Sequence, residues 1–226
     1  MALTQYKIDS NLVGANGQEG VVSQKALLDG TPFTAEWLAK MALDGNMYTI
    51  NAGTGTAPIT SAGAYVNTTP DLDVSCPAGV MCIPVFLNIA VEAYGTTALF
   101  EAVAAIGVGG VLTPTAFESI TPVNNRLDLT GGSGLTAGST GTGATYMTTN
   151  VIEFARFVHN KMVTIATADD DSSIGPAQYT WSALQTGCWP IMYSPSSITR
   201  LNVFMSCQAT TGFITLVVVV PPLAAS

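Results

Sequence analysis

Residues 212–222 read GFITLVVVVPP, and this stretch decides the fold class. Its apolar part, residues 213–220, is far shorter than the about 20 residues that a membrane-spanning helix needs. The four consecutive valines disfavour a helix and fit a pleated sheet, while Pro221 and Pro222 cannot continue a ladder of backbone hydrogen bonds. We therefore predict a β-strand that lies in the middle of a sheet, is buried on both faces and ends at the prolines.

Working back from this stretch, most of the chain consists of short apolar segments separated by Gly, Pro, Asn and Ser, which is typical of β-strands joined by turns. In the longest segment, residues 80–94, alternation places one set of side chains on a common face, namely Ile83, Val85, Leu87, Ile89 and Val91. Pro84 predicts an edge or a bulge at the start of that strand. Further strands are predicted at residues 47–51, 62–67, 98–111, 146–157, 161–168, 179–184, 189–193 and 200–208.

One segment, residues 31–46 (TPFTAEWLAKMALDGN), predicts a helix, with Thr31 or Thr34 as its N-cap and Gly45 as its end. We expect Trp37 on this helix to pack into the core. Residues 131–145 (GGSGLTAGSTGTGAT) are small and carry no apolar anchor, which predicts an exposed loop.

Strands that do not alternate with helices disfavour a parallel α/β sheet. The remaining architectures are a jelly roll, an immunoglobulin-like sandwich and a barrel. A chain of 226 residues with long connections favours the first. The predicted fold is all-β, a two-sheet antiparallel jelly-roll sandwich with one short α-helix, in which residues 1–30 form an extended N-terminal arm and residues 31–226 a single domain.

The surface of this protein carries few charges, because charged residues make up 10% of the chain against about 25% in an ordinary soluble domain. So bare an exterior predicts that copies of the chain or other partners cover much of it. The alternative is a monomer kept in solution by its hydroxyl groups and its net charge of −8. The acidic balance excludes nucleic-acid binding by phosphate neutralisation, which needs clustered Lys and Arg.

Catalytic chemistry has little support in the residue types. Nucleophilic triads need a histidine beside a nucleophile, and the single histidine, His159, is expected to be structural or at an interface. The cysteines have no zinc-ligand spacing, and we expect buried free thiols; they are Cys76, Cys82, Cys188 and Cys207. The prediction is a protein that is not an enzyme, without catalytic or cofactor-binding residues.

The densest charge cluster is Asp169, Asp170 and Asp171, in the segment TADDDSSIGP. Three adjacent carboxylates on a loop are candidate calcium ligands, since calcium takes 6–8 oxygen ligands. The alternative is a solvated acidic loop tip. Asp71 and Asp73 form a weaker candidate of the same kind.

Three stretches, PFTAEWLAKMALDGNMYTI, CIPVFLNIAVEAY and GFITLVVVVPP, together with the sparse charge, resemble single jelly-roll viral coat proteins. The resemblance implies a virion structural protein that self-assembles into a shell, with copies of itself, and a second virion protein where one completes the particle, as partners. This chain lacks the basic N-terminal arm with which many coat proteins condense RNA. The segment MALTQYKIDS has no secretory pattern, which predicts synthesis in the host cytoplasm without membrane insertion, and then a place in the virion.

Two other functions stay open at this point. A trimeric spike or carbohydrate-binding β-sandwich module needs exposed aromatic side chains, for which Trp181 and Trp189 are the candidates. A β-sandwich glycoside hydrolase needs two carboxylates facing each other in a cleft. The candidates for that pair are Glu92, Glu101, Glu118 and Glu153. For Trp181 and Trp189 the alternative is packing in the core.

Overall fold

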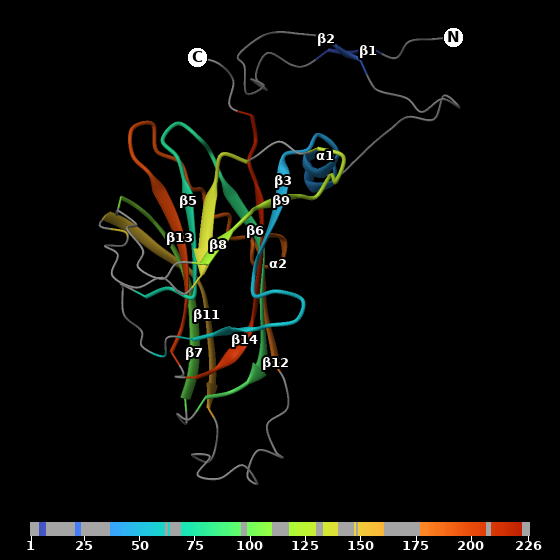
Figure 1. Ribbon diagram of the computed structural model, residues 1–226. Helices are drawn as coiled ribbons and strands as arrows, with labels where there is room; N and C mark the ends of the chain where they lie inside the picture. The colour runs from blue at the N-terminus through green and yellow to red at the C-terminus, as the bar shows by residue number, and fades with distance from the viewer. Residues whose placement is uncertain are drawn as a thin grey trace.

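The computed structural model contains two antiparallel sheets packed face to face (Figure 1). The residues that it describes are 5–7, 21–23, 37–61, 63, 69–95, 99–109, 118–129, 133–139, 147, 149–160, 177–206 and 209–222. Sheet 1 has the order β12 (Ala177–Ser182), β6 (Ile83–Ala93), β14 (Thr211–Val219), β3 (Met47–Ala52) and β9 (Val123–Asn124), with β4 (Ile59–Thr60) also paired to β14. Sheet 2 has the order β11 (Thr149–Asn160), β7 (Leu99–Val108), β13 (Thr199–Met205), β5 (Leu72–Cys76), β10 (Thr136–Ser139) and β8 (Glu118–Ile120).

The connections between the two sheets define the topology. Eight long strands make two four-stranded sets, β12-β6-β14-β3 in sheet 1 and β11-β7-β13-β5 in sheet 2. Along the chain β3, β5, β6 and β7 alternate between the sheets, β7 and β11 are neighbours in sheet 2, and β12, β13 and β14 alternate again. This order is that of a jelly roll, so the predicted two-sheet antiparallel sandwich is confirmed.

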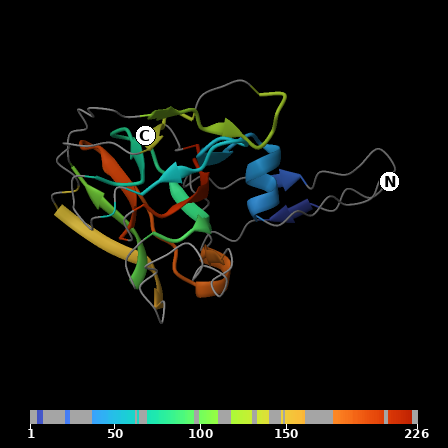
Figure 2. The ribbon, with the colours of Figure 1, turned by 60° about the horizontal axis from the view of Figure 1, so that its bottom comes forward.

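The strand predicted from GFITLVVVVPP is β14, and it lies between β3 and β6 in the middle of sheet 1. One of its faces is fully buried, with Ile214, Leu216 and Val218 inaccessible to solvent. The prediction of burial on both faces is wrong in part, because the side chains of alternate residues are half-buried. At one end of the strand Val217 and Val219 pack against helix α1 (Trp37–Leu43), which lies beside β3 (Figure 2).

The predicted helix is α1. Its predicted first residues, 31–36, lie outside the described residues. It ends at Gly45, which adopts the left-handed conformation with φ 77°. The Gly45 amide donates to the Ala42 carbonyl and the Asn46 amide donates to the Met41 carbonyl, and these two bonds form a Schellman motif. A side chain at position 45 would also collide with Leu129.

Strand β6 follows the predicted alternation from Leu87 to Val91, since Leu87, Ile89 and Val91 are buried in the core between the sheets. Ile83 and Val85 were predicted on the same face, but they pack in a second cluster with Val219 and α1. The bulge predicted at Pro84 is present: Val217 pairs with Phe86 and Val218 with Pro84, so Val85 is the extra residue. A proline in an interior strand is tolerated at this point because β12 pairs with β6 only as far as Phe86.

Several sequence-based assignments are wrong. Residues 136–139, inside the predicted exposed loop 131–145, form β10, which is hydrogen-bonded to β5 and β8 and is mostly buried. Residues 183–186 form a second helix, α2 (Ala183–Thr186), which ends the predicted strand 179–184 early. The predicted strand 189–193 is a single bridge between Cys82 and Met192.

Some assignments fall where the structure gives no description. The predicted strand 161–168 and most of 62–67 lie outside the described residues. Within the predicted arm, residues 1–30, the structure describes only a pair of short strands, β1 (Gln5–Lys7) and β2 (Val21–Ser23). Among the described residues, none of the helices has both the length and the apolar character to cross a membrane.

Candidate interaction surface

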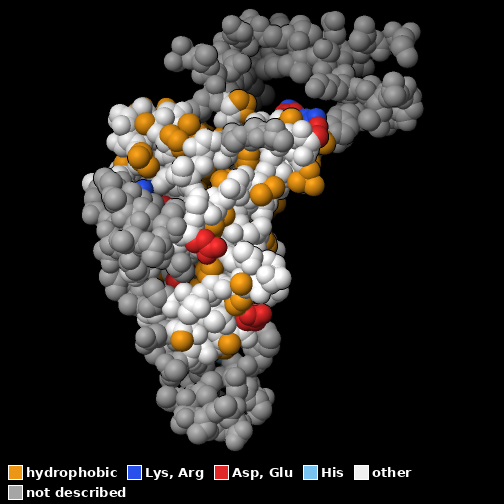
Figure 3. All heavy atoms as spheres, viewed as in Figure 1, with side chains coloured by type: hydrophobic (Ala, Val, Ile, Leu, Met, Phe, Trp, Pro, Cys, Tyr) orange, Lys and Arg blue, Asp and Glu red, His pale blue; other side chains and the backbone are white. Residues whose placement is uncertain are grey.

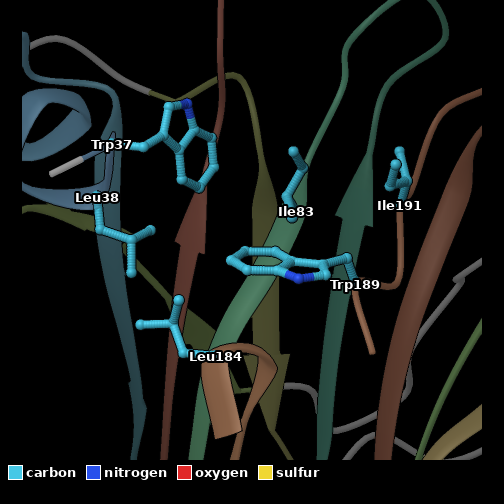
Figure 4. Close-up of a pocket in the computed structure, with 6 residues that line it drawn as sticks. All are labelled: Trp37, Leu38, Ile83, Leu184, Trp189 and Ile191. Carbon is cyan, nitrogen blue, oxygen red and sulfur yellow. The ribbon is translucent and has the colours of Figure 1, made fainter. Parts of the chain in front are cut away.

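An apolar groove of about 700 Å³ opens beside sheet 1. Trp37 and Leu38 of α1 form one of its sides, and Ile83 of β6, Leu184 of α2, Trp189 and Ile191 complete its lining (Figure 4). The two indole rings meet edge to face with their centroids 5.9 Å apart. The described residues that line this groove are all hydrophobic or aromatic, so it can bind apolar groups but offers few partners for polar ones.

The structure describes all three tryptophans, and the expectation for Trp37 is wrong. Trp37, expected in the core, is 43% exposed at the groove wall. Trp181, a candidate for an exposed carbohydrate-stacking residue, is 4% exposed and packs edge to face against Phe154. Trp189, the other candidate, is 39% exposed, which fits the exposed alternative and not core packing. Among the described residues of the groove, the exposed indoles therefore have aliphatic neighbours and no polar side chain that could hydrogen-bond a sugar.

Large hydrophobic side chains also lie exposed outside the groove. Figure 3 shows apolar side chains spread over one face of the molecule with few charged groups among them. The most exposed is Leu127, and Val151, Ile152 and Val158 are each more than half exposed. Scattered exposed hydrophobic residues are ordinary, but their combination with so few charges favours association between molecules.

The structure describes one of the two proposed acidic clusters. Asp169, Asp170 and Asp171 lie outside the described residues, so the calcium prediction stays a prediction. Asp71 and Asp73 lie at strand β5, which the sequence analysis missed, and both are buried. No group of three His, Cys, Asp or Glu side chains within the described part of the chain has a geometry that suits a metal ion.

Asp73 is part of a buried polar cluster on sheet 2. Arg200 donates from Nη1 to Asp73 Oδ1 at 2.9 Å, and Asn202 donates from Nδ2 to the same oxygen at 2.6 Å. All three side chains are at most 3% exposed. Asp71 accepts a hydrogen bond from the Met205 amide at 2.6 Å. Asp73 therefore joins β5 to β13, and Asp71, just before β5, also bonds to β13. Both carboxylates are used in contacts between strands and not as calcium ligands.

Burial raises the pKa of Asp73 to about 6, although Arg200, Asn202 and Ser75 act in the opposite direction. In the unfolded chain the same carboxyl group titrates near 3.8. Between these two values the folded protein holds a proton that the unfolded chain has lost, so stability falls as the pH rises from 4 to 6. The carboxyl group is buried throughout and becomes charged in the folded protein only as the pH passes about 6.

We expect this group to make the protein about 1 kcal/mol more stable at pH 5 than at pH 7. The measurement is urea unfolding at both pH values, compared with an Asp73→Leu/Arg200→Met variant that lacks the carboxyl group. An equal change in the two proteins would show that other groups cause the pH dependence.

The remaining candidate residues do not form a reactive site in the described structure. Cys76 and Cys82 are buried free thiols, as predicted, and burial raises the pKa of both, whereas Cys188 is exposed. His159 stacks on Tyr94 with ring centroids 5.3 Å apart. Tyr94 packs edge to face against Phe100, which stacks on Tyr179. His159 is therefore a packing residue of an aromatic cluster.

Two of the four candidate glutamates do come together. Glu101 and Glu153 both form ion pairs with Arg156 on the exposed face of sheet 2. Glu118 instead lines a separate hollow of about 260 Å³. The pairing of Glu101 and Glu153 joins two strands through an arginine, which differs from the two opposed carboxylates of a glycoside hydrolase.

Two comparisons of the sequence with known proteins are without a match. No family model matches it. No curated protein matches it in sequence. What the fold and the surface define is an all-β jelly-roll protein with a sparsely charged exterior and an apolar groove.

Proposed function

We propose that this protein is a coat subunit of a virion, made in the host cytoplasm, which self-assembles into a shell through its weakly charged surfaces. The observation that carries the proposal is the jelly-roll strand order in a chain of which only 10% is charged. Jelly rolls are used both by capsid proteins and by lectins, so the fold alone does not choose between them. The exposed apolar groups favour the shell, because contacts between subunits would cover them.

The carbohydrate-binding alternative has less support. Of its two candidate aromatic residues, Trp181 is buried in the core. Trp189 lies in a groove lined by Leu38, Ile83 and other apolar side chains, where sugar hydroxyls would lose their hydrogen bonds to water without replacement.

The test is negative-stain imaging and mass photometry of the purified protein at neutral pH, without nucleic acid. Closed particles of uniform size are expected, since the net charge of −8 gives no reason for a nucleic-acid scaffold. A discrete monomer or trimer would contradict the proposal. Loss of the particles on addition of a chelator would support calcium binding by Asp169, Asp170 and Asp171.

If the apolar groove lies in a contact between subunits, a charge at Ile191 would be buried there. We expect an Ile191→Asp variant to raise the protein concentration needed for assembly about tenfold. Ile191 is 53% exposed, so the monomer should still fold. Thr56→Asp adds the same charge at another exposed position and is the matched control. Equal assembly of the two variants would exclude the groove from the contact.

A further inference from the structure

Strand β11 lies at the edge of sheet 2, paired with β7 on one side and with no described strand on the other. It is the longest described strand, at 12 residues. Val151, Ile152 and Val158 are 54%, 55% and 58% exposed. A long apolar edge strand offers unpaired backbone groups to another strand, and proteins usually protect such edges. An edge of this kind points to a partner.

A β-bulge in β11 sets which side chains share a face. Glu153 pairs with Ala105 and Ala155 pairs with Ala104, so Phe154 is an extra residue without a partner of its own. Without the bulge, Glu153 and Arg156 would point to opposite faces, because side chains alternate along a strand. With it they share the outer face, where Arg156 donates from Nε to Glu153 Oε1 at 2.7 Å.

The sequence of β11, TNVIEFARFVHN, is complementary to itself when it is read in the opposite direction. Centred between Phe154 and Ala155, antiparallel pairing brings Glu153 opposite Arg156 twice. The same register places Ile152 opposite Phe157, and their partners in β7, Ile106 and Ala102, put both on the inner face. It also places Val151 opposite Val158. Opposite charges and apolar pairs that directly face each other stabilise adjacent strands.

We propose that β11 pairs antiparallel with β11 of a second copy of this chain, about a two-fold axis between Phe154 and Ala155, to join two copies of sheet 2 into one continuous sheet. Rotation about a two-fold axis perpendicular to a sheet maps the inner face onto the inner face and the outer face onto the outer face. Two residues that are opposite each other across this axis must therefore lie on the same face. The bulge at Phe154 satisfies this condition for residues 152–157. The contact is isologous, as in most symmetric dimers.

This pairing would be one contact of the proposed shell, and only its place in a shell rests on the proposed function. Its first test is charge reversal measured by sedimentation equilibrium. Glu153→Arg and Arg156→Glu should each raise the dimer dissociation constant about 30-fold, because two attractive pairs become repulsive. An equimolar mixture of the two variants should dimerise, since each variant supplies the charge that the other lacks.

The double variant Glu153→Arg/Arg156→Glu is the matched control, because it restores opposite charges at positions 153 and 156 within and between chains and loses only the ion pair of residue 156 with Glu101. It should dimerise like the unmodified protein. Circular dichroism of each variant separates a loss of folding from a loss of pairing. Dimerisation of both single variants at the original affinity, or failure of their mixture to dimerise, would overturn the proposal.

The second test traps the register by a disulfide. Two proteins, Val151→Cys and Val158→Cys, both with Cys188→Ser, are mixed under mild oxidation with oxidised glutathione. Directly opposed Cβ atoms in adjacent strands lie close enough for a disulfide, so a heterodimeric product should form faster than with Val151→Cys alone. Equal cross-linking would contradict this register. If particles form but the cross-link does not, the pairing of β11 is refuted and the proposed shell is not. If cross-linked dimers form but particles do not, the proposed shell is refuted and the pairing of β11 is not.

Discussion

An Asp73→Ala variant is expected to lose about 3–5 kcal/mol of folding stability, which is the usual result of removing one partner from a buried ion pair. Arg200 is 3% exposed, and its guanidinium would stay buried without the carboxylate that faces it at 2.9 Å. Asn202 would lose the acceptor of its hydrogen bond as well. Urea unfolding at pH 7, with the slope checked for two-state behaviour, measures the difference.

The Asp73→Leu/Arg200→Met variant tests the cause of this loss. Because it removes both buried charges, it should recover most of the stability, apart from about 1–3 kcal/mol for the Asn202 amide left without its acceptor. A double variant as unstable as Asp73→Ala would mean that packing of the side chains, rather than charge, determines the cost.

Replacement of Leu216 by Ala is expected to lower the free energy of unfolding by about 3 kcal/mol, within the range found for large-to-small changes in well-packed cores. Leu216 is inaccessible to solvent and lies between Ile50 of β3 and Leu87 of β6 in the register of sheet 1. The central position of β14 restricts how far its neighbours can move to fill the cavity.

Thr215→Ala is the control for this substitution, because Thr215 is next along the same strand but is only half-buried on the other face. It should cost less than about 1 kcal/mol, the span of β-strand preferences. Both values come from urea unfolding, with near-ultraviolet circular dichroism as a check on the fold. Equal losses from the two variants would contradict the burial of a single face.

The sequence predicts the parts of the fold that depend on local apolar patterns. Leu87 and Ile89 alternate with less buried residues, and the run around Val218 is followed by prolines, so β6 and β14 were identifiable. Strand β10 was not identifiable, because Ala137 and Gly138 carry no apolar signal and are buried by neighbouring strands. Strand β5 has the alternation of a strand but was missed because Asp73 was interpreted as a candidate calcium ligand, and its partner Arg200 is 127 positions away.

The candidate interaction surface was less predictable than the fold. Aromatic residues usually indicate a core, yet Trp37 and Trp189 meet at a groove that only the arrangement of α1, α2 and β6 creates. The complementarity within β11 is visible in the sequence, but Glu153 and Arg156 are three positions apart and alternation would place them on opposite faces. Only the bulge at Phe154, seen in the pairing with β7, brings them to one face.

The place of β14 has a consequence for synthesis on the ribosome. Strands β3 and β6 are complete by residue 93, but the strand that separates them, Thr211–Val219, is translated 126 residues later. At about 5–20 residues per second, the nascent chain carries a sheet with a missing centre for roughly 6–25 seconds. Folding of sheet 1 therefore waits for residues 211–219, and until then β3 and β6 lack the central strand with which both pair.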